Sequence, residues 1–183
     1  LAVLVKLMRC NLELAEQLCV TLAEELDFVK TYIDLERRSL GADFHLIIEI
    51  GEDVHSEQVL LPSMLIQIPV ENAVKHALRD KEGERNLWIS IHRRENGICI
   101  KVTDNGGGYR PGSRNRGTGT GMKVLSQTIQ LLNSYNRYPL IMQINNVEIK
   151  ERGELGCEVK FTIPLDYSYL LGRAKDTNLW KRC

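Results

Sequence analysis

The stretch from Leu61 to Gly121 constrains the fold of this chain more than any other part. It contains three separated pieces: PVENAVKHAL at 69–78, VTDNGGGY at 102–109 and GTGTGMKV at 117–124. Each piece alone is a weak signal. Their order and spacing, with a helix, a strand end and a glycine-rich helix start as their expected settings, predict a nucleotide-binding pocket.

The first piece is predicted to lie on a helix from Ser63 to Arg79, because this span has no glycine and Pro62 stands where a helix can begin. At 3.6 residues per turn its apolar side chains gather on one side. Six polar side chains share the opposite arc: Gln67, Glu71, Asn72, Lys75, His76 and Arg79. Pro69 should kink the first turns or remove one hydrogen bond.

Two interpretations of that polar arc stay open from the residues alone. It is either the solvated face of an amphipathic helix or part of a site. A carboxamide and a carboxylate on one face can hold Mg²⁺ through oxygen and water, while Lys75 and His76 can meet phosphate. Asn72 favours the site, because asparagine is a poor helix former in a helix interior.

The second piece is predicted to be a strand that ends in glycines. Three apolar residues alternate with more polar ones along it: Ile98, Ile100 and Val102. Asp104 has the same parity, so it should point toward the core, where a carboxylate needs hydrogen bonds. Either the strand stops at Thr103 and Asp104 opens a turn, or Asp104 accepts a hydrogen bond from the amine of a base. The glycines at 106–108 then permit close approach of the backbone.

The third piece places Gly117, Gly119 and Gly121 ahead of a helical pattern from about Met122 to Asn133. Glycines that lead into a helix offer unpaired N–H groups to phosphate. A Rossmann loop needs a strand directly before it, and a P-loop ends in Gly-Lys-Ser/Thr. Neither pattern fits, because 110–116 reads as a polar loop, so the sequence predicts a phosphate cradle of another kind.

Together the pieces resemble the N box (ENAVKH), G1 box (DNGGG) and G2 box (GTGTG) of the GHKL superfamily, the Bergerat-fold ATPases that include histidine kinases and gyrase B. LPSMLIQIPVENAVKHAL, and LAEELDFVKTYIDLERRSLGADF upstream of it, are similar to sensor histidine kinases of the LytS/YehU type. The resemblance covers roughly 21–165. It implies an α+β fold, a Bergerat two-layer sandwich: a mixed β-sheet covered on one face by helices, preceded by the end of a helical dimerisation region.

The resemblance also implies a role for each matching residue. Asn72 would coordinate the Mg²⁺ that bridges the ATP phosphates, and Glu71 beside it is a candidate base or water-orienting group. Lys75 and His76 match positions that reach phosphate, so Glu71, Asn72 and Lys75 are the candidate catalytic residues. Asp104 would accept a hydrogen bond from the adenine amine. Five glycines would shape the wall and the phosphate loop: Gly106, Gly108, Gly117, Gly119 and Gly121.

The implied function is the ATP-binding catalytic domain of a two-component sensor histidine kinase, with ATP and Mg²⁺ as cofactors. It would pass the γ-phosphate to a histidine and thence to an aspartate of a response regulator, in a homodimer formed through the upstream helical region. No Pro-His-Phe motif occurs here, so we expect the phosphoacceptor outside this sequence. His76 would lie in the ATP pocket, and the other histidines, at 45, 55 and 92, on the surface.

Two alternatives remain open at this point. One is another GHKL ATPase, such as an anti-sigma-type serine kinase, which the upstream EELDFVKTYIDLERRSL segment disfavours. The other is a pseudokinase, a non-catalytic dimer scaffold that binds nucleotide or nothing. Pro69 and Thr120, which stands where the family often has an aliphatic residue, keep the second alternative open.

The expected organisation has three parts. Residues 1–40 form the end of the dimerisation and phosphoacceptor region with a connecting helix, 41–165 the ATP-binding domain, and 166–183 a loose tail. Residues 1 to about 18 are apolar at helical spacing. A capping box at Thr21 and Glu24 starts a helix that ends near Ser39, closed by Gly41.

Four further strands follow from the period-2 patterns. They are expected at 44–50, from Leu87 to the Asn96-Gly97 turn, at 140–144 and at 158–163. The second of these forms a hairpin with the strand that ends at Asp104.

Composition limits the classes of partner. The 24 basic and 24 acidic residues balance, so nothing indicates a nucleic-acid or membrane surface partner. Five cysteines without a C-x-x-C pair suit a reducing cytosol and argue against a disulfide framework or a zinc site. No apolar run has the length of a membrane span. We therefore expect a cytoplasmic domain, a fragment of a longer protein anchored in the cell membrane through other parts.

Overall fold

The computed structural model describes residues 17–109, 120–149 and 153–170. Its centre is a five-stranded mixed sheet in the order β2-β4-β5-β7-β6, in which only β2 and β4 run parallel. The strands are β2 (Phe44–Ile50), β4 (Arg85–Arg94), β5 (Gly97–Asp104), β6 (Ile141–Ile149) and β7 (Glu154–Pro164). Strand β5 therefore lies in the middle, paired on both sides.

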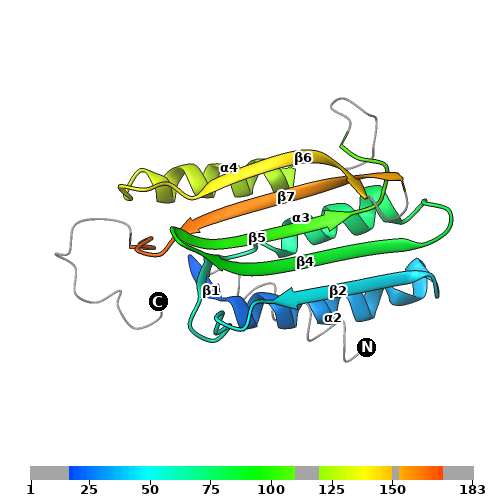
Figure 1. Ribbon diagram of the computed structural model, residues 1–183, viewed down its shortest axis with the longest axis horizontal. Helices are drawn as coiled ribbons and strands as arrows, with labels where there is room; N and C mark the ends of the chain where they lie inside the picture. The colour runs from blue at the N-terminus through cyan, green and yellow to red at the C-terminus, as the bar shows by residue number, and fades with distance from the viewer. Residues whose placement is uncertain (1–16, 110–119, 150–152, 171–183) are drawn as a thin grey trace.

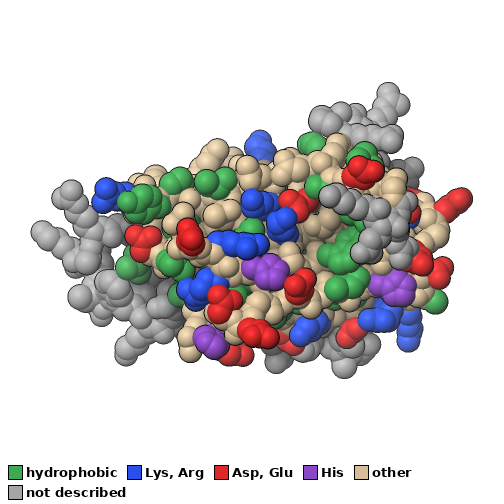
Figure 2. All heavy atoms as spheres, viewed as in Figure 1, with side chains coloured by type: hydrophobic (Ala, Val, Ile, Leu, Met, Phe, Trp, Pro, Cys, Tyr) green, Lys and Arg blue, Asp and Glu red, His purple; other side chains and the backbone are tan. Residues whose placement is uncertain are grey.

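The helices of the described ranges cover one face of this sheet, as Figure 1 shows. They are α2 (Leu22–Leu40), α3 (Gln67–Asn72) with its continuation as the π-helix η1 (Ala73–Leu78), and α4 (Thr120–Asn133). The other face carries basic and acidic side chains side by side (Figure 2), among them the Lys101–Glu158 ion pair across β5 and β7 at 2.9 Å. The predicted α+β sandwich, helices on one face of a mixed sheet, is confirmed.

Helix α2 has the predicted ends. The Glu24 N–H donates to Thr21 Oγ1 (3.2 Å) and the Thr21 N–H to Glu24 Oε2 (2.7 Å), which completes the capping box. The helix ends at Gly41, whose φ of 78° suits a residue without Cβ. Its apolar face, with Phe28 and Val29, lies in the same core as the inward side chains of β4, β5 and β7. The division after residue 40 stays a prediction.

A second, two-stranded antiparallel sheet was not expected from the sequence. It pairs β1 (Cys19–Thr21) with β3 (Leu60–Pro62). Pro62 therefore ends a strand instead of beginning a helix, and the N-box helix starts at Gln67, later than the predicted Ser63. A proline can stand in such a short edge strand because its missing N–H need not join a ladder.

The hairpins differ from prediction in detail. Arg94 pairs with Gly97, so the β4–β5 turn is Glu95-Asn96 and not Asn96-Gly97. Strands β6 and β7 extend past their predicted ends to Ile149 and back from Glu154. The sequence hid this length because β6 is an edge strand and its added part begins with the exposed pair Asn145-Asn146, so no apolar alternation marks it.

Tyr167 and Tyr169 pack against the domain, so the expectation of a loose tail is wrong for this part of the tail. The Tyr167 hydroxyl donates to Asn133 Oδ1 at the end of α4, and the buried Tyr169 hydroxyl donates to the Leu60 carbonyl, both at 2.7 Å. These side-chain bonds connect segments far apart in sequence. The predictions for 1–16 and 171–183 lie outside the described residues.

Candidate functional site

Asp104 is buried at the end of the central strand. It pairs with Leu87 of β4 and Cys157 of β7, so the strand ends at Asp104 and not at Thr103. Asp104 also opens the turn that follows, because its carboxylate accepts from a backbone N–H two residues later. Its side chain is 6% exposed, and the Gly106 N–H donates to its Oδ1 at 2.8 Å. Burial raises the pKa of this carboxyl, and the N–H groups of Gly106 and Cys157 oppose the rise. The predicted inward carboxylate is present.

The glycines after Asp104 allow two close contacts. A Cβ on Gly106 would lie 2.4 Å from the Cβ of Ala77, so the G1 turn touches the N-box helix there. A Cβ on Gly108, whose φ is +81°, would lie 2.9 Å from Oδ1 of Asn146. Asn146 holds the end of the turn, since it accepts from the Tyr109 N–H (2.6 Å) and donates to the Tyr109 carbonyl (3.1 Å).

The side chain of Asn105 also holds this turn in place. The sequence did not identify Asn105 as a site residue. Its side chain is 1% exposed. Its Oδ1 accepts from the Asn86 N–H at 2.8 Å, and its Nδ2 donates to the Glu84 carbonyl at 3.0 Å and to Glu154 Oε2 at 2.7 Å. The Asp-Asn-Gly turn chemistry was the available signal. The partners come from distant segments, which no local pattern shows.

The N-box helix is short and changes its winding. Pro69 falls in the first turn of α3, where a missing N–H is tolerated. After Asn72 the helix widens: the Arg79 N–H donates to the Val74 carbonyl (3.1 Å), the i→i−5 pattern of a π-helix. Such widened turns often occur at functional positions.

The polar arc of this helix is a set of paired side chains. Glu71 accepts from Gln67 Nε2 at 2.9 Å and from Lys75 Nζ at 2.7 Å. The Lys75 ammonium also lies 6.0 Å from the centre of the Tyr32 ring of α2. Asn72 is half-buried and His76 exposed. Gln67, predicted on the exposed arc, is buried because it sits at the helix start against α2.

The G2 helix meets the N-box helix at its first turn. Gly121 lies inside α4, and a Cβ there would be 3.3 Å from Ile68 Cγ2 of α3. Gly117 and Gly119 lie outside the described residues. The described parts of the G1 and G2 boxes thus each lie against the N-box helix, G1 through Gly106 and Ala77, G2 through Gly121 and Ile68.

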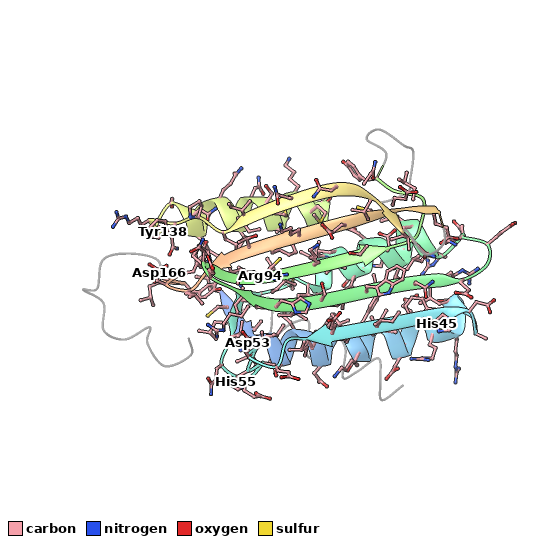
Figure 3. The ribbon with its side chains drawn as sticks, in the orientation of Figure 1. His45, Asp53, His55, Arg94, Tyr138 and Asp166 are labelled. Carbon is pink, nitrogen blue, oxygen red and sulfur yellow. The ribbon has the colours of Figure 1, made fainter. Side chains whose placement is uncertain are left out.

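The remaining histidines lie elsewhere. His45 and His55 are exposed, near the two ends of β2 (Figure 3), and His92 faces Glu49 at 3.7 Å. The exposure of His45 and His55 agrees with the prediction of surface residues, and His92 is half-buried.

Within 17–109, 120–149 and 153–170, no three His, Cys, Asp or Glu side chains gather as a metal cage. Mg²⁺ is commonly held by one or two protein oxygens together with water and ligand phosphate. The amide oxygen of Asn72 beside the Glu71 carboxylate fits that chemistry. In the same ranges no helix is both long and apolar enough to cross a membrane.

Comparison with known proteins agrees with this geometry. The family model described as "Histidine kinase-, DNA gyrase B-, and HSP90-like ATPase" matches residues 61–167, more than half of the chain. The chain therefore belongs to this family, and its relatives place it among ATPase domains of the LytS type.

Those relatives are longer proteins. The sensor protein LytS of Bacillus subtilis is 28% identical over 167 residues, and the sensor histidine kinase YpdA of Escherichia coli is 32% identical over 157 residues. Each match covers 86% of this chain but 26% of the relative, so the chain spans about a quarter of their length.

Solved structures share the fold. The histidine kinase domain of the Erythrobacter litoralis blue-light activated kinase has a TM-score of 0.55 at 18% identity, covering 80% of this chain and 62% of that one. The Acinetobacter baumannii histidine kinase AdeS has a TM-score of 0.54 at 16% identity, covering 88% and 77%. The predicted family and fold are confirmed.

Proposed function

We propose that this chain is the ATP-binding catalytic domain of a two-component sensor histidine kinase. The observation that carries the proposal is the buried Asp104 at the end of β5, in a turn whose Gly106 lies against the helix that carries Asn72. The candidate acceptor for the base and the candidate amide for the cation would then belong to one site. The relatives are named as sensor proteins and sensor histidine kinases, which supports the same class of activity.

Each side chain would have a defined task. Asp104 would accept a hydrogen bond from the exocyclic amine of adenine, and the Gly106 N–H at its Oδ1 keeps the carboxylate oriented. Asn72 would hold Mg²⁺, which neutralises charge on the transferred phosphoryl group when bound. Lys75 would leave Glu71 for the phosphates, and Glu71 would then orient the acceptor. His76, exposed on the same helix, would also reach phosphate.

The chemistry needs positioning more than covalent help from the protein. We therefore place the acceptor histidine in the helical dimerisation region of the full-length protein and the final acceptor in a response regulator. Gly117, Gly119 and Gly121 would bind phosphate through the backbone at the start of α4. ATP in the cell is available on the cytoplasmic side, where we place the domain, with the membrane anchor in other parts of the protein.

Calorimetry with a non-hydrolysable ATP analogue tests the site. Wild type should bind in Mg²⁺, and Asp104→Ala and Asn72→Ala should each bind at least about tenfold more weakly, because each loses a hydrogen bond or metal contact to a charged group. Asp34→Asn, an exposed carboxylate of α2, is the matched control. If all variants bound the analogue as tightly as wild type, the nucleotide would not bind at Asp104 and Asn72, and the proposed site would be wrong.

Phosphotransfer separates the kinase from the alternatives. The full-length protein, given ATP labelled at the γ-phosphate, should become labelled. Acid should remove this label and base should not, because the P–N bond of phosphohistidine is labile to acid and stable to base. A label stable to acid would indicate a serine kinase. Binding without any transferred label, in the full-length dimer, would indicate a pseudokinase.

A further inference from the structure

The start of the N-box helix has no cap from its own sequence. Helix α3 begins after Ile66, which makes no side-chain capping bond, and it follows a turn in which Met64 has a φ of +66°. The first N–H groups of a helix need partners from outside it. Only six residues of α-helix precede the π-helix, so this element has little stability of its own.

A carboxylate from α2 supplies the missing partners. Glu25 is 0% exposed, and its Oε2 accepts from the N–H groups of Ile66 (3.0 Å) and Gln67 (3.1 Å). Its Oε1 accepts from the N–H of Met64. The left-handed backbone at Met64 turns these donors toward one carboxylate. An acceptor-only group with two oxygens matches this cluster of donors.

Helix α2 also contacts the rest of the N-box helix. Tyr32 lies beneath the Lys75 ammonium, and Glu36 forms a 2.9 Å ion pair with Arg79 just past the end of η1. Glu25, Tyr32 and Glu36 thus contact the start, middle and end of one element. Of these contacts only the one at Glu25 is fully buried and made to the backbone, so it determines where the helix begins.

We propose that Glu25 is a positioning residue of the nucleotide site, acting through Asn72. It holds the start of the helix that carries Asn72, and so places the amide that would bind Mg²⁺. Asp104 is held independently, by β4, β7 and the Gly106 N–H. Loss of Glu25 should therefore weaken the Mg²⁺-dependent part of nucleotide binding and spare the part that depends on the base. This inference rests on the proposed function.

The test measures the 183-residue chain by calorimetry with a non-hydrolysable ATP analogue, once in Mg²⁺ and once in EDTA. Glu25→Gln keeps the size of the side chain and replaces one of the two acceptor oxygens by an NH₂ group, which cannot accept from the backbone N–H groups. It should weaken binding about tenfold in Mg²⁺, the size of effect seen for groups that orient metal ligands, and less than about twofold in EDTA. Asp34→Asn removes a charge from the same helix at an exposed position and should change neither value.

A double-mutant cycle separates positioning from general support. In an Asn72→Ala background, Glu25→Gln should cause no further loss in Mg²⁺, because the residue through which it acts is gone. Additive losses, or equal losses in Mg²⁺ and EDTA, would overturn the proposal. Wild-type affinity of Glu25→Gln in both conditions would also overturn it.

Thermal unfolding of each variant accompanies these titrations. If Glu25→Gln does not fold, Glu25→Asp keeps the charge on a shorter side chain and takes its place. It should lower the ratio of Mg²⁺ to EDTA affinity, and a folded variant with the wild-type ratio would refute the proposal. Wild type that fails to bind in either condition would refute the proposed function instead, which keeps the two failures distinct.

Discussion

The two sides of the site are built in different ways. Asp104 belongs to the central strand β5, and Asn105 beside it makes three side-chain hydrogen bonds to β4, to the loop before it and to β7. Asn72 belongs to a short helix that widens into a π-helix and is capped from another helix. The side that we propose for the base is held by strands on both sides, whereas the side that we propose for phosphate depends on how α2 lies against it.

The two kinds of support predict that the Asp104 side is rigid and that the Asn72 side can move. A strand paired along both edges moves only with the whole sheet, because each displacement breaks several backbone bonds. A helix held at its start by one carboxylate can shift when that contact changes. If the proposed roles of Asn72 and Asp104 hold, a displacement of α2 would alter phosphate and Mg²⁺ binding before it altered recognition of the base. Three experiments test this contrast.

The largest expected effect is on the pH dependence of stability through Glu25. Burial raises the pKa of Glu25 to about 7 in the folded protein, from 4.5, and the N–H donors of the N-box helix oppose the rise. Because the pKa of Glu25 is higher in the folded than in the unfolded protein, protonation of Glu25 favours folding. This contribution to the unfolding free energy is fully present below the unfolded pKa and is lost as the pH rises through the folded pKa.

Denaturant unfolding at about pH 5 and about pH 8 measures this loss. Wild type should lose about 2–3 kcal/mol of unfolding free energy more than Glu25→Gln between these values. Asp104, whose pKa is also raised, contributes in the same direction to both proteins and cancels in the difference. Parallel curves for the two proteins would show that Glu25 does not titrate in this range.

The second effect concerns the contact between the two sides. Gly106→Ala would place a methyl group 2.4 Å from the Cβ of Ala77, and should lower the unfolding free energy by about 2 kcal/mol through overpacking. Gly107→Ala is the matched control, because its φ is +94° but no atom lies within 4 Å of the added Cβ. It should cost only about 1 kcal/mol of backbone strain. Equal losses would mean that the turn, and not the contact, sets the cost.

The smallest effect is expected on the surface of the N-box helix. The Glu71–Lys75 pair is partly exposed and four residues apart. Glu71→Gln should therefore change the unfolding free energy by less than about 0.5 kcal/mol. The same variant in the full-length kinase should transfer phosphate more slowly, since Glu71 is the candidate base. Glu57→Gln, an exposed carboxylate in the loop before β3, should change neither quantity. A large stability loss would show that the phosphate side depends on this pair.

Much of the site could be predicted because its signals are local. The parity of Asp104 with Ile98, Ile100 and Val102 placed its carboxylate inward, and the structure agrees. The capping box at Thr21 and the helix end at Gly41 were equally readable. The roles of Glu71, Asn72, Lys75 and His76 in ligand binding stay predictions, as do those of the glycines.

Other features could not be predicted, because the interacting groups are far apart in the chain. Gln67 read as polar and exposed, yet it is buried under α2. The β1–β3 pair joins two three-residue strands whose own patterns are too short to recognise. From the sequence, Asn105 is an ordinary turn residue. Its hydrogen-bond partners Glu84 and Glu154 are distant in the chain and reach it only in the folded protein.

Local patterns were sufficient to predict three elements that a period or a run of glycines marks: the strand that ends at Asp104, the helix that carries Asn72 and the glycine turn at 106–108. Tertiary structure alone decided where the N-box helix begins. Glu25 and its backbone donors at 64–67 lie about forty residues apart. A carboxylate becomes a helix cap only when packing removes water and brings those N–H groups to it.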